Sequence, residues 1–325
     1  MEILVYSGLE LLGDGIVKLP FVRALRRTWP EARITWLAGK GRTVYADLLR
    51  PLVADCLDEV IENAGIGTAA GELMRRPLAG RSFDLVIDTQ RRVLTTLILR
   101  RIRARRFVSG AAGFLLSSRR PRLPYRKPAA LVGQLFDLIE IASGSRPVPD
   151  FGLRLDERWR GEAALLLPEG PTYVGIAPGA GGAHKRWPLE RFLALAQEQL
   201  DAGRMPVFLL GPDEADWLGA IRAVLPQARF PLQQAAASGA PSPLLTIALA
   251  QRLAVAVAND SGTGHLIAAG GCAMVSLFGP TRAAKFAPCA ARLEIVEAGA
   301  FGAAAMEAIP LAAVTAAIER LLAPA

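Results

Sequence analysis

The chain has 325 residues, of which 52% are hydrophobic and 21% charged, a balance that excludes a disordered protein. Its length predicts two domains, and three cysteines without a CxxC pair exclude a disulfide framework or a cysteine zinc site and favour a reducing compartment. The N-terminal MEILVYSGLE lacks the basic start and long apolar stretch of a signal peptide, and no uncharged run is typical of a membrane span. We therefore expect a cytoplasmic protein.

In the first half of the chain, short aliphatic runs alternate with amphipathic stretches, which predicts strands that alternate with helices. The expected strands are Glu2–Tyr6, Arg33–Leu37, Glu59–Ile61, Asp84–Asp88 and Arg106–Ser109. The expected helices are Val17–Thr28, Thr43–Leu49, Thr68–Met74, Arg91–Arg101 and Ala129–Ala142. The segment SGSRPVPDFGLRL that follows is rich in proline and glycine, and it predicts a domain boundary.

The same alternation restarts in the second half. The expected strands are Tyr173–Ala177, Pro206–Leu210, Leu253–Ala258 and Ala273–Phe278. The expected helices are Leu189–Leu200, Asp213–Val224, Pro243–Gln251, Gly264–Ala269 and Leu311–Leu322.

This pattern predicts an α/β protein with parallel sheets covered by helices on both faces, arranged as two Rossmann-like domains. We expect a first domain at residues 1–150, a linker at 151–170, and a second domain at 171–308. A C-terminal helix within 309–325 is expected to pack back on the first domain. Because ligands of parallel sheets bind at the carboxyl ends of the strands, the predicted site is a cleft shared by the two domains.

The positive charge of the chain is concentrated in residues 91–127, which contain twelve basic residues and no acidic one. The rest of the chain has 26 basic and 30 acidic residues, so this segment accounts for the whole net charge of +8. Such a segment attracts anions, whether a nucleic acid, an anionic membrane surface or a phosphorylated acceptor. Few aromatic residues accompany it for base stacking, and a solvated helix face and loop is the alternative.

The segment LELLGDGIVKLP follows the first expected strand. Its glycines do not form the dinucleotide fingerprint GxGxxG, because the third glycine is missing. Asp14, between Gly13 and Gly15, is either the N-cap of the next helix or a general base at the floor of the cleft.

In the second half, VGIAPGAGGAHKRWP follows the strand at Tyr173–Ala177. Its glycines and then Lys185, just before a helix, are typical of a phosphate site, since free backbone N–H groups and a cation converge there. The P-loop pattern GxxxxGK[ST] is absent, and a flexible loop that ends in basic residues is the alternative. Glu214, in VFLLGPDEAD, either binds the hydroxyls of a ribose or is one of the acids that helix N-termini favour.

The segment NDSGTGHL follows the strand at Leu253–Ala258 and begins a helix of small residues. Hydroxyls and backbone amides at the N-terminus of a helix favour an anion. We favour a site role for His265 over a structural one, because it lies beside Asp260, Ser261 and Thr263. No GxSxG elbow indicates a serine hydrolase.

Together these segments resemble the heptosyltransferases of bacterial lipopolysaccharide synthesis, glycosyltransferase family 9. The matching text is GDGIVKLPFVRALRRTWPEARITWL and FDLVIDTQ in the first half, then PGAGGAHKRWPLERFLALA, LLGPDEAD, NDSGTGHL and FGPT in the second. The segments occur in the order of the family and span nearly the whole chain. One departure is Gly264, where the family usually has a larger apolar residue, and this bears on the base or sugar pocket.

The resemblance implies a GT-B architecture, with two Rossmann-like domains facing a central cleft, and an inverting transfer without a metal or other cofactor. It implies that Asp14 deprotonates the acceptor hydroxyl, that Lys185 pairs with the donor diphosphate, and that Glu214 holds the ribose. The other implied donor-side residues are Asp260, which orders the site, and Ser261, Gly262, Thr263, Gly264 and His265 at the helix N-terminus. The candidates for acceptor binding, in the basic segment, are Arg91, Arg92 and Arg122.

The predicted function is the transfer of a heptose or related sugar from an ADP-sugar to a lipopolysaccharide core or similar glycan. The expected partners are that donor, an anionic glycolipid acceptor and the inner face of the cytoplasmic membrane, and not a nucleic acid. Two alternatives stay open: a GT-B transferase that uses a UDP- or GDP-sugar, and a non-catalytic protein that binds nucleotides or nucleic acid.

Overall fold

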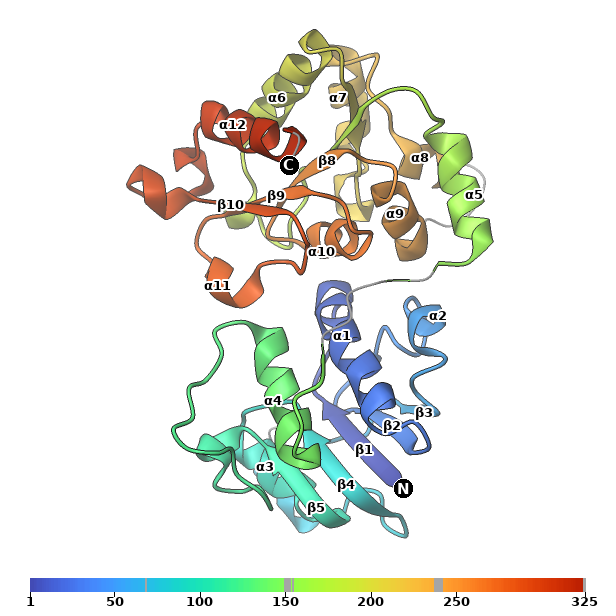
Figure 1. Ribbon diagram of the computed structural model, residues 1–325, viewed down its shortest axis with the longest axis vertical. Helices are drawn as coiled ribbons and strands as arrows, with labels where there is room; N and C mark the ends of the chain where they lie inside the picture. Colours follow the sequence, from blue (N-terminus) through green and yellow to red (C-terminus); the bar gives the residue numbers. More distant parts are fainter. Residues whose placement is uncertain (68, 149–152, 154, 237–241, 324–325) are drawn as a thin grey trace. The chain divides into compact units, whose positions relative to one another are not determined.

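A computed structural model of the chain describes residues 1–67, 69–148, 153, 155–236 and 242–323 (Figure 1). The chain divides into two compact units, Met1–Phe151 and Gly152–Ala325. Each unit is built on its own five-stranded sheet, and every strand pair in both sheets is parallel. The predicted α/β class with two parallel sheets is therefore confirmed. Residues 151, 152 and 154 of the predicted linker lie outside the described residues.

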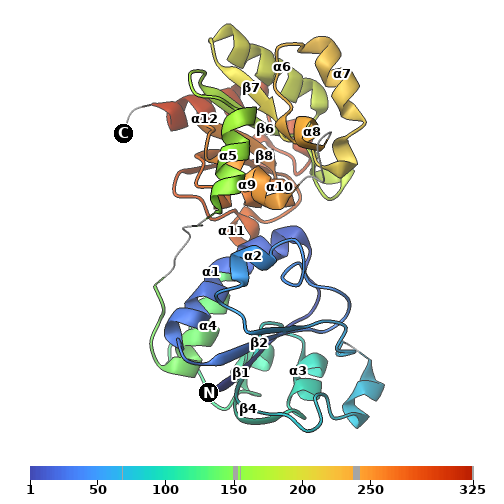
Figure 2. The ribbon, with the colours of Figure 1, turned by 90° about the vertical axis from the view of Figure 1, so that its right-hand side faces the viewer.

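The sheet of the first unit has the strand order β3-β2-β1-β4-β5. The strands are β1 (Glu2–Ser7), β2 (Arg33–Ala38), β3 (Glu59–Ile61), β4 (Ser82–Asp88) and β5 (Arg103–Ser109). The helices are α1 (Leu12–Thr28), α2 (Arg50–Val53), α3 (Val93–Leu99) and α4 (Leu131–Ser143), with 3-10 turns at Ala70–Met74 and Ala111–Phe114. Figure 2 shows α1 and α4 on one face of the sheet and α3 on the other. The aliphatic run of β1 is buried because it lies at the centre of the sheet with helices on both faces.

The helix predicted at Thr43–Leu49 is wrong, because residues 44–49 form turns and α2 begins only at Arg50. The helical spacing of Tyr45 and Leu49 arises because both are buried against the start of α1, where the Tyr45 hydroxyl donates to the carbonyl of Gly15 at 2.7 Å. The segment predicted as a helix at Thr68–Met74 is a short 3-10 turn from Ala70, and Thr68 lies outside the described residues.

The sheet of the second unit has the strand order β10-β9-β8-β6-β7. The strands are β6 (Tyr173–Ala177), β7 (Met205–Phe208), β8 (Val255–Asn259), β9 (Met274–Phe278) and β10 (Leu293–Glu297). The helices are α5 (Glu157–Leu166), α6 (Leu189–Asp201), α7 (Trp217–Val224), α8 (Pro231–Ala236), α9 (Pro243–Ala250), α10 (Gly262–Ala269), α11 (Ala283–Phe286) and α12 (Leu311–Leu322). Helix α5 lies within the segment predicted as a linker and packs on α9.

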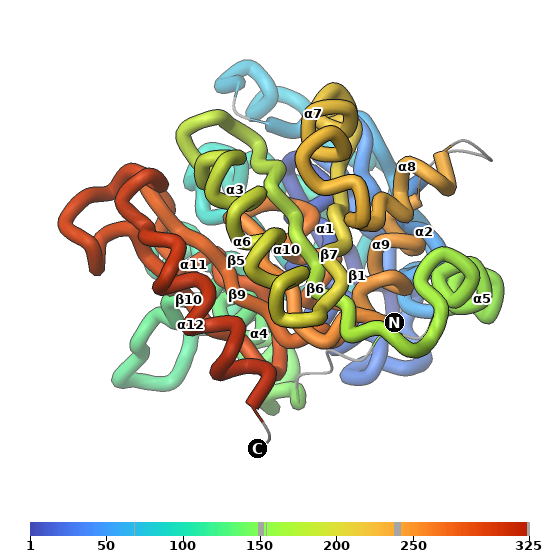
Figure 3. Tube along the Cα trace, turned by 90° about the horizontal axis from the view of Figure 1, so that it is seen from above, coloured from blue at the N-terminus to red at the C-terminus, as the bar shows by residue number. Residues whose placement is uncertain are grey.

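The last helix, α12, packs against β8, β9, β10 and α6 of the second unit (Figure 3). Its apolar residues Val314, Ala317, Ile318 and Leu321 belong to the core of that unit. The face that we expected to pack on the first domain is thus used within the second. None of the helices in the described part of the chain has the length and apolar character needed to cross a lipid bilayer.

Asp88, at the end of β4, is a fully buried carboxylate that joins three elements of the first unit. It accepts hydrogen bonds from the hydroxyls of Thr96 on α3 at 2.6 Å and Ser109 on β5 at 2.8 Å. The backbone N–H of Gln90 also donates to it, at 2.8 Å. Burial raises the pKa of Asp88 to about 6, although these hydrogen bonds lower it.

The raised pKa of Asp88 predicts a stability that depends on pH. Since an unfolded aspartate titrates near pH 4, the folded chain binds the extra proton between about pH 4 and about pH 6. The free energy of unfolding should therefore fall as pH rises through this window, and Asp88→Asn should remove this part of the slope. Urea denaturation across the window measures it, with the exposed Asp47→Asn as control. An Asp88→Asn slope equal to that of wild type would contradict the assignment.

Candidate functional site

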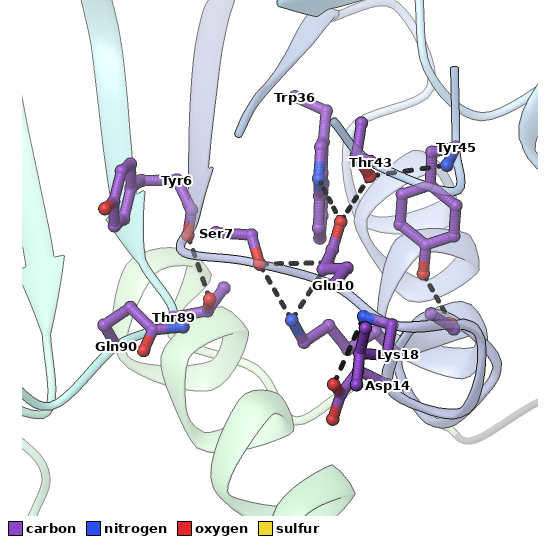
Figure 4. Close-up of polar contacts among 12 residues, drawn as sticks. Tyr6, Ser7, Glu10, Asp14, Lys18, Trp36, Thr43, Tyr45, Thr89 and Gln90 are labelled. Atoms are coloured by element: carbon purple, nitrogen blue, oxygen red, sulfur yellow. Dashed lines mark hydrogen bonds and ion pairs between the residues drawn. The ribbon is translucent and has the colours of Figure 1, made fainter. Parts of the chain in front are cut away.

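A buried carboxylate organises the carboxyl end of β1 in the first unit (Figure 4). Glu10, in the loop between β1 and α1, is 4% exposed, and each of its oxygens accepts two hydrogen bonds. Oε1 accepts from Lys18 Nζ and Ser7 Oγ, both at 2.9 Å. Oε2 accepts from Trp36 Nε1 at 3.0 Å and Thr43 Oγ1 at 2.5 Å.

Lys18 completes this arrangement from the second turn of α1. The residue is 6% exposed, and its ammonium donates to Ser7 Oγ at 2.8 Å as well as to Glu10. Burying an ion pair costs free energy unless further hydrogen bonds satisfy the two charges. Here the two oxygens of Glu10 accept four hydrogen bonds in total. The pair therefore connects β1, β2, α1 and the turn before α2 through hydrogen bonds to one carboxylate.

Asp14 lies on the first turn of α1, next to this pair, but it is exposed. It stands at the third helical position and Leu11 is the N-cap, so the N-cap alternative for Asp14 is wrong by three residues. Its carboxylate accepts the backbone N–H of Leu11 at a long 3.4 Å. At Gly15 a Cβ atom would lie 2.4 Å from Val44 Cγ2, so glycine allows the 44–49 turn to pack against this end of α1. The turn that carries Asp14 is thus packed in place, and the carboxylate is accessible.

The second unit places Lys185, Asp260 and Thr281 together at the carboxyl ends of β6, β8 and β9. Lys185 Nζ lies 2.9 Å from Asp260 Oδ2, and the Thr281 hydroxyl donates to the same oxygen at 2.7 Å. The Lys185 side chain is 28% exposed, whereas that of Asp260 is 10% exposed. The carboxylate therefore orients an ammonium group that solvent or a ligand can reach.

Helix α10 begins directly after Asp260. Ser261 is its N-cap and accepts the N–H of Gly264 at 3.2 Å. Gly262, Thr263 and His265 are half-buried on the first turn, but Gly264 is buried, and a Cβ there would lie 3.2 Å from both Ala258 Cβ and the carbonyl of Asn259. Gly264 is therefore in contact with β8, and its small size serves this packing.

Asn259 was not among the residues selected from the sequence, although it directly precedes Asp260. Its side chain is 1% exposed, and it donates to the carbonyl of Pro178 at 2.8 Å and accepts the N–H of Trp187 at 3.1 Å. Trp187 in turn donates through Nε1 to the carbonyl of Ile309 at 2.9 Å. These bonds fasten both ends of the loop that carries Lys185 to the end of β8.

Glu214 lies in the 3-10 turn after β7, and only 5% of it is exposed. Arg186 Nη2 approaches its Oε1 at 3.5 Å. A Cβ at Gly179 would lie 2.5 Å from the Glu214 carboxyl carbon, so this glycine accommodates the glutamate in addition to any ligand. Burial raises the pKa of Glu214, and the charge of Arg186 opposes that change.

The acceptor candidates lie in two loops of the first unit. Arg91 and Arg92 are exposed after β4, and Arg122 is exposed in the loop between β5 and α4. The guanidinium of Arg91 lies 5.8 Å from the ring centre of Phe114, whose ring meets Tyr125 edge-on at 5.3 Å. Arg91 thus lies at the base of the loop that carries Arg122.

Among the residues that the structure describes, no group of three or more His, Cys, Asp or Glu side chains is placed to hold a metal ion.

Removing one partner of the Glu10–Lys18 pair should destabilise the protein strongly. Glu10→Leu leaves the ammonium of Lys18 buried without a carboxylate, and should lower the free energy of unfolding by about 3–5 kcal/mol. The double variant Glu10→Leu/Lys18→Met removes both charges and should recover most of that loss. Glu157→Ala, which breaks the exposed Arg160–Glu157 pair, should cost at most about 1 kcal/mol. Urea denaturation compares the three, and a double variant as unstable as Glu10→Leu would contradict the account.

Comparison with known proteins identifies the family. The model of glycosyltransferase family 9 (heptosyltransferase) matches residues 73–308. Similar solved structures include the family 9 glycosyl transferase of Veillonella parvula DSM 2008, with 22% identity, a TM-score of 0.71, and 99% of this chain and 97% of that chain covered. E. coli ADP-heptose LPS heptosyltransferase II has 20% identity and a TM-score of 0.66, with 99% of this chain and 98% of that chain covered. E. coli heptosyltransferase WaaC with ADP has 18% identity and a TM-score of 0.68, with 99% of this chain and 100% of that chain covered.

A search of curated protein sequences gives no match. The identities to the solved structures are low and show a common fold, in which the two parallel sheets are those of the GT-B heptosyltransferases. The family model covers most of the chain and agrees with the resemblance of the sequence motifs. The chain therefore belongs to glycosyltransferase family 9 and is a glycosyltransferase.

Proposed function

We propose that the protein transfers a heptose, or a closely related sugar, from an ADP-sugar to a lipopolysaccharide core or a similar anionic glycan. The observation that carries the proposal is the ammonium of Lys185, which Asp260 holds at 2.9 Å beside the start of α10. The family supports a heptose as the sugar. ADP is the proposed nucleotide because similar heptosyltransferases are described with ADP or an ADP-sugar.

The donor diphosphate binds to Lys185 and to the N-terminus of α10. Gly262 and Thr263 are the first two residues of α10, so their N–H groups have no acceptor within the helix and are free to donate to an anion. Glu214 accepts the hydroxyls of the ribose, and His265 lies on the donor side on the first turn of α10. The cation and the helix amides stabilise the departing diphosphate without a metal ion.

On the acceptor side, Asp14 is the general base. It takes the proton of the acceptor hydroxyl while that oxygen attacks the anomeric carbon of the sugar. The bond from that carbon to the diphosphate oxygen breaks on the opposite face, so the configuration inverts and ADP leaves with the electron pair. Arg91, Arg92 and Arg122 bind phosphate or carboxylate groups of the acceptor. The protein works in the cytoplasm, at the inner face of the cytoplasmic membrane, where a glycolipid acceptor is available.

Asp14→Asn tests the reaction and the role of the base together. It keeps the shape of the side chain but cannot take a proton, so kcat with ADP-heptose and a lipopolysaccharide-core acceptor should fall about 10²–10⁴-fold. The Kd for ADP should stay within about two-fold of wild type, because the base lies in the other unit. Asp47→Asn is the matched control and should retain full turnover. Wild-type protein without transferase activity, or an Asp14→Asn variant with normal kcat, would contradict the proposal.

A further inference from the structure

The loop between β5 and α4 is on the outside of the first unit (Figure 1). Its residues 119–127, which we call the basic loop, expose five cations to solvent: Arg119, Arg120, Arg122, Arg126 and Lys127. In the part of the chain that the structure describes, none of the five forms an ion pair. The loop therefore concentrates cations that have no ion-pair partner among the described residues.

The acids closest to the basic loop already have a partner. Asp137 and Glu140 of α4 each lie 2.8 Å from Arg146 Nη1. This arrangement leaves the arginines of the loop available to an external anion.

Leu123 lies in the middle of these cations and is 90% exposed. The loop around it is anchored, since the Tyr125 hydroxyl donates to Asp137 at 2.8 Å and the Tyr125 ring packs edge-on against Phe114. On the other side, Ser118 bonds through its N–H and its hydroxyl oxygen to the backbone of Phe107 on β5. An anchored loop that exposes a leucine between cations presents an apolar group and a positive field together.

A cavity of about 590 Å³ lies between the basic loop and α4. Four of the loop arginines and Tyr125 contribute to its walls, together with Arg146 and the two acids that pair with it, Asp137 and Glu140. The four loop arginines outnumber the acids of this lining and can bind a phosphate, because arginine binds phosphate through charged, paired hydrogen bonds.

We propose that the basic loop docks the protein on a bilayer that contains anionic phospholipid. Leu123 enters the boundary between headgroups and acyl chains, and the arginines bind the lipid phosphates. An apolar side chain inside a basic cluster fits a lipid surface better than a nucleic acid, whose backbone offers charge but no apolar layer. The inference deepens the proposed function, since it names the surface that brings the enzyme to a membrane-borne acceptor.

Sedimentation with vesicles tests the docking without donor or acceptor. Full-length protein should bind phosphatidylcholine vesicles that contain phosphatidylglycerol, and should not bind vesicles of phosphatidylcholine alone. Raising the salt to about 1 M, where the Debye length is about 3 Å, should release it. Equal binding to both kinds of vesicle would overturn the proposal, and so would binding to a duplex oligonucleotide but not to anionic vesicles.

Two pairs of matched variants test the basic loop itself. Arg119→Gln/Arg120→Gln should weaken vesicle binding by at least about ten-fold, because each cation near an anionic surface is worth about five-fold. Arg75→Gln/Arg76→Gln changes the net charge equally at another exposed arginine pair of the same unit, and should weaken binding much less. Leu123→Ser should also weaken binding, whereas Leu165→Ser, at a residue 86% exposed on α5, should not.

Equal losses within either pair would overturn the proposal. All the substituted residues are exposed, so circular dichroism and thermal melting should match wild type in all four variants. Asp14→Asn should bind vesicles normally. A failure of catalysis with intact vesicle binding therefore counts against the transferase and not against the docking surface.

Discussion

The buried pair of Glu10 and Lys18 is the constraint on which the side of the first unit that carries the proposed base depends. In a parallel sheet the loops after the strands carry the polar groups, and such loops need internal bonds to hold one conformation. Here one carboxylate receives four hydrogen bonds from β1, β2, α1 and the turn before α2. Asp14 lies on the turn of α1 between Glu10 and Lys18 in sequence, so the position of the proposed base follows from the pair.

In the second unit the side-chain amide of Asn259, and not an ion pair, holds the loop in one conformation. Asn259 joins both ends of the loop after β6, and the next residue, Asp260, orients Lys185. In each unit a buried polar group thus lies beside a more exposed charged group. The buried group fixes the loop, and the accessible one is left for chemistry.

Much of this architecture could be predicted from the sequence, because the central strands are aliphatic runs buried on both faces. Strand β10 was missed because LEIVE is a short segment with two glutamates, and it lies at the edge of the sheet, where only β9 pairs with it. The motifs predicted that Lys185 and Asp260 belong to one site, and the structure brings them together. Glu10, Lys18 and Asn259 were missed because a charged or amide side chain is normally expected on the surface. Their burial arises only from contacts between segments that are distant in the sequence.

Calorimetric titration of ADP, UDP and GDP in the presence of a metal chelator tests the central claim most directly. We expect wild-type protein to bind ADP more tightly than UDP or GDP, and Lys185→Ala to bind ADP at least about ten-fold more weakly, since a hydrogen bond to a charged group is worth about 1.5–3 kcal/mol. Lys127→Ala removes an exposed lysine of the first unit and should bind ADP as wild type does. Absence of nucleotide binding, or equal ADP binding by Lys185→Ala and wild type, would contradict the account.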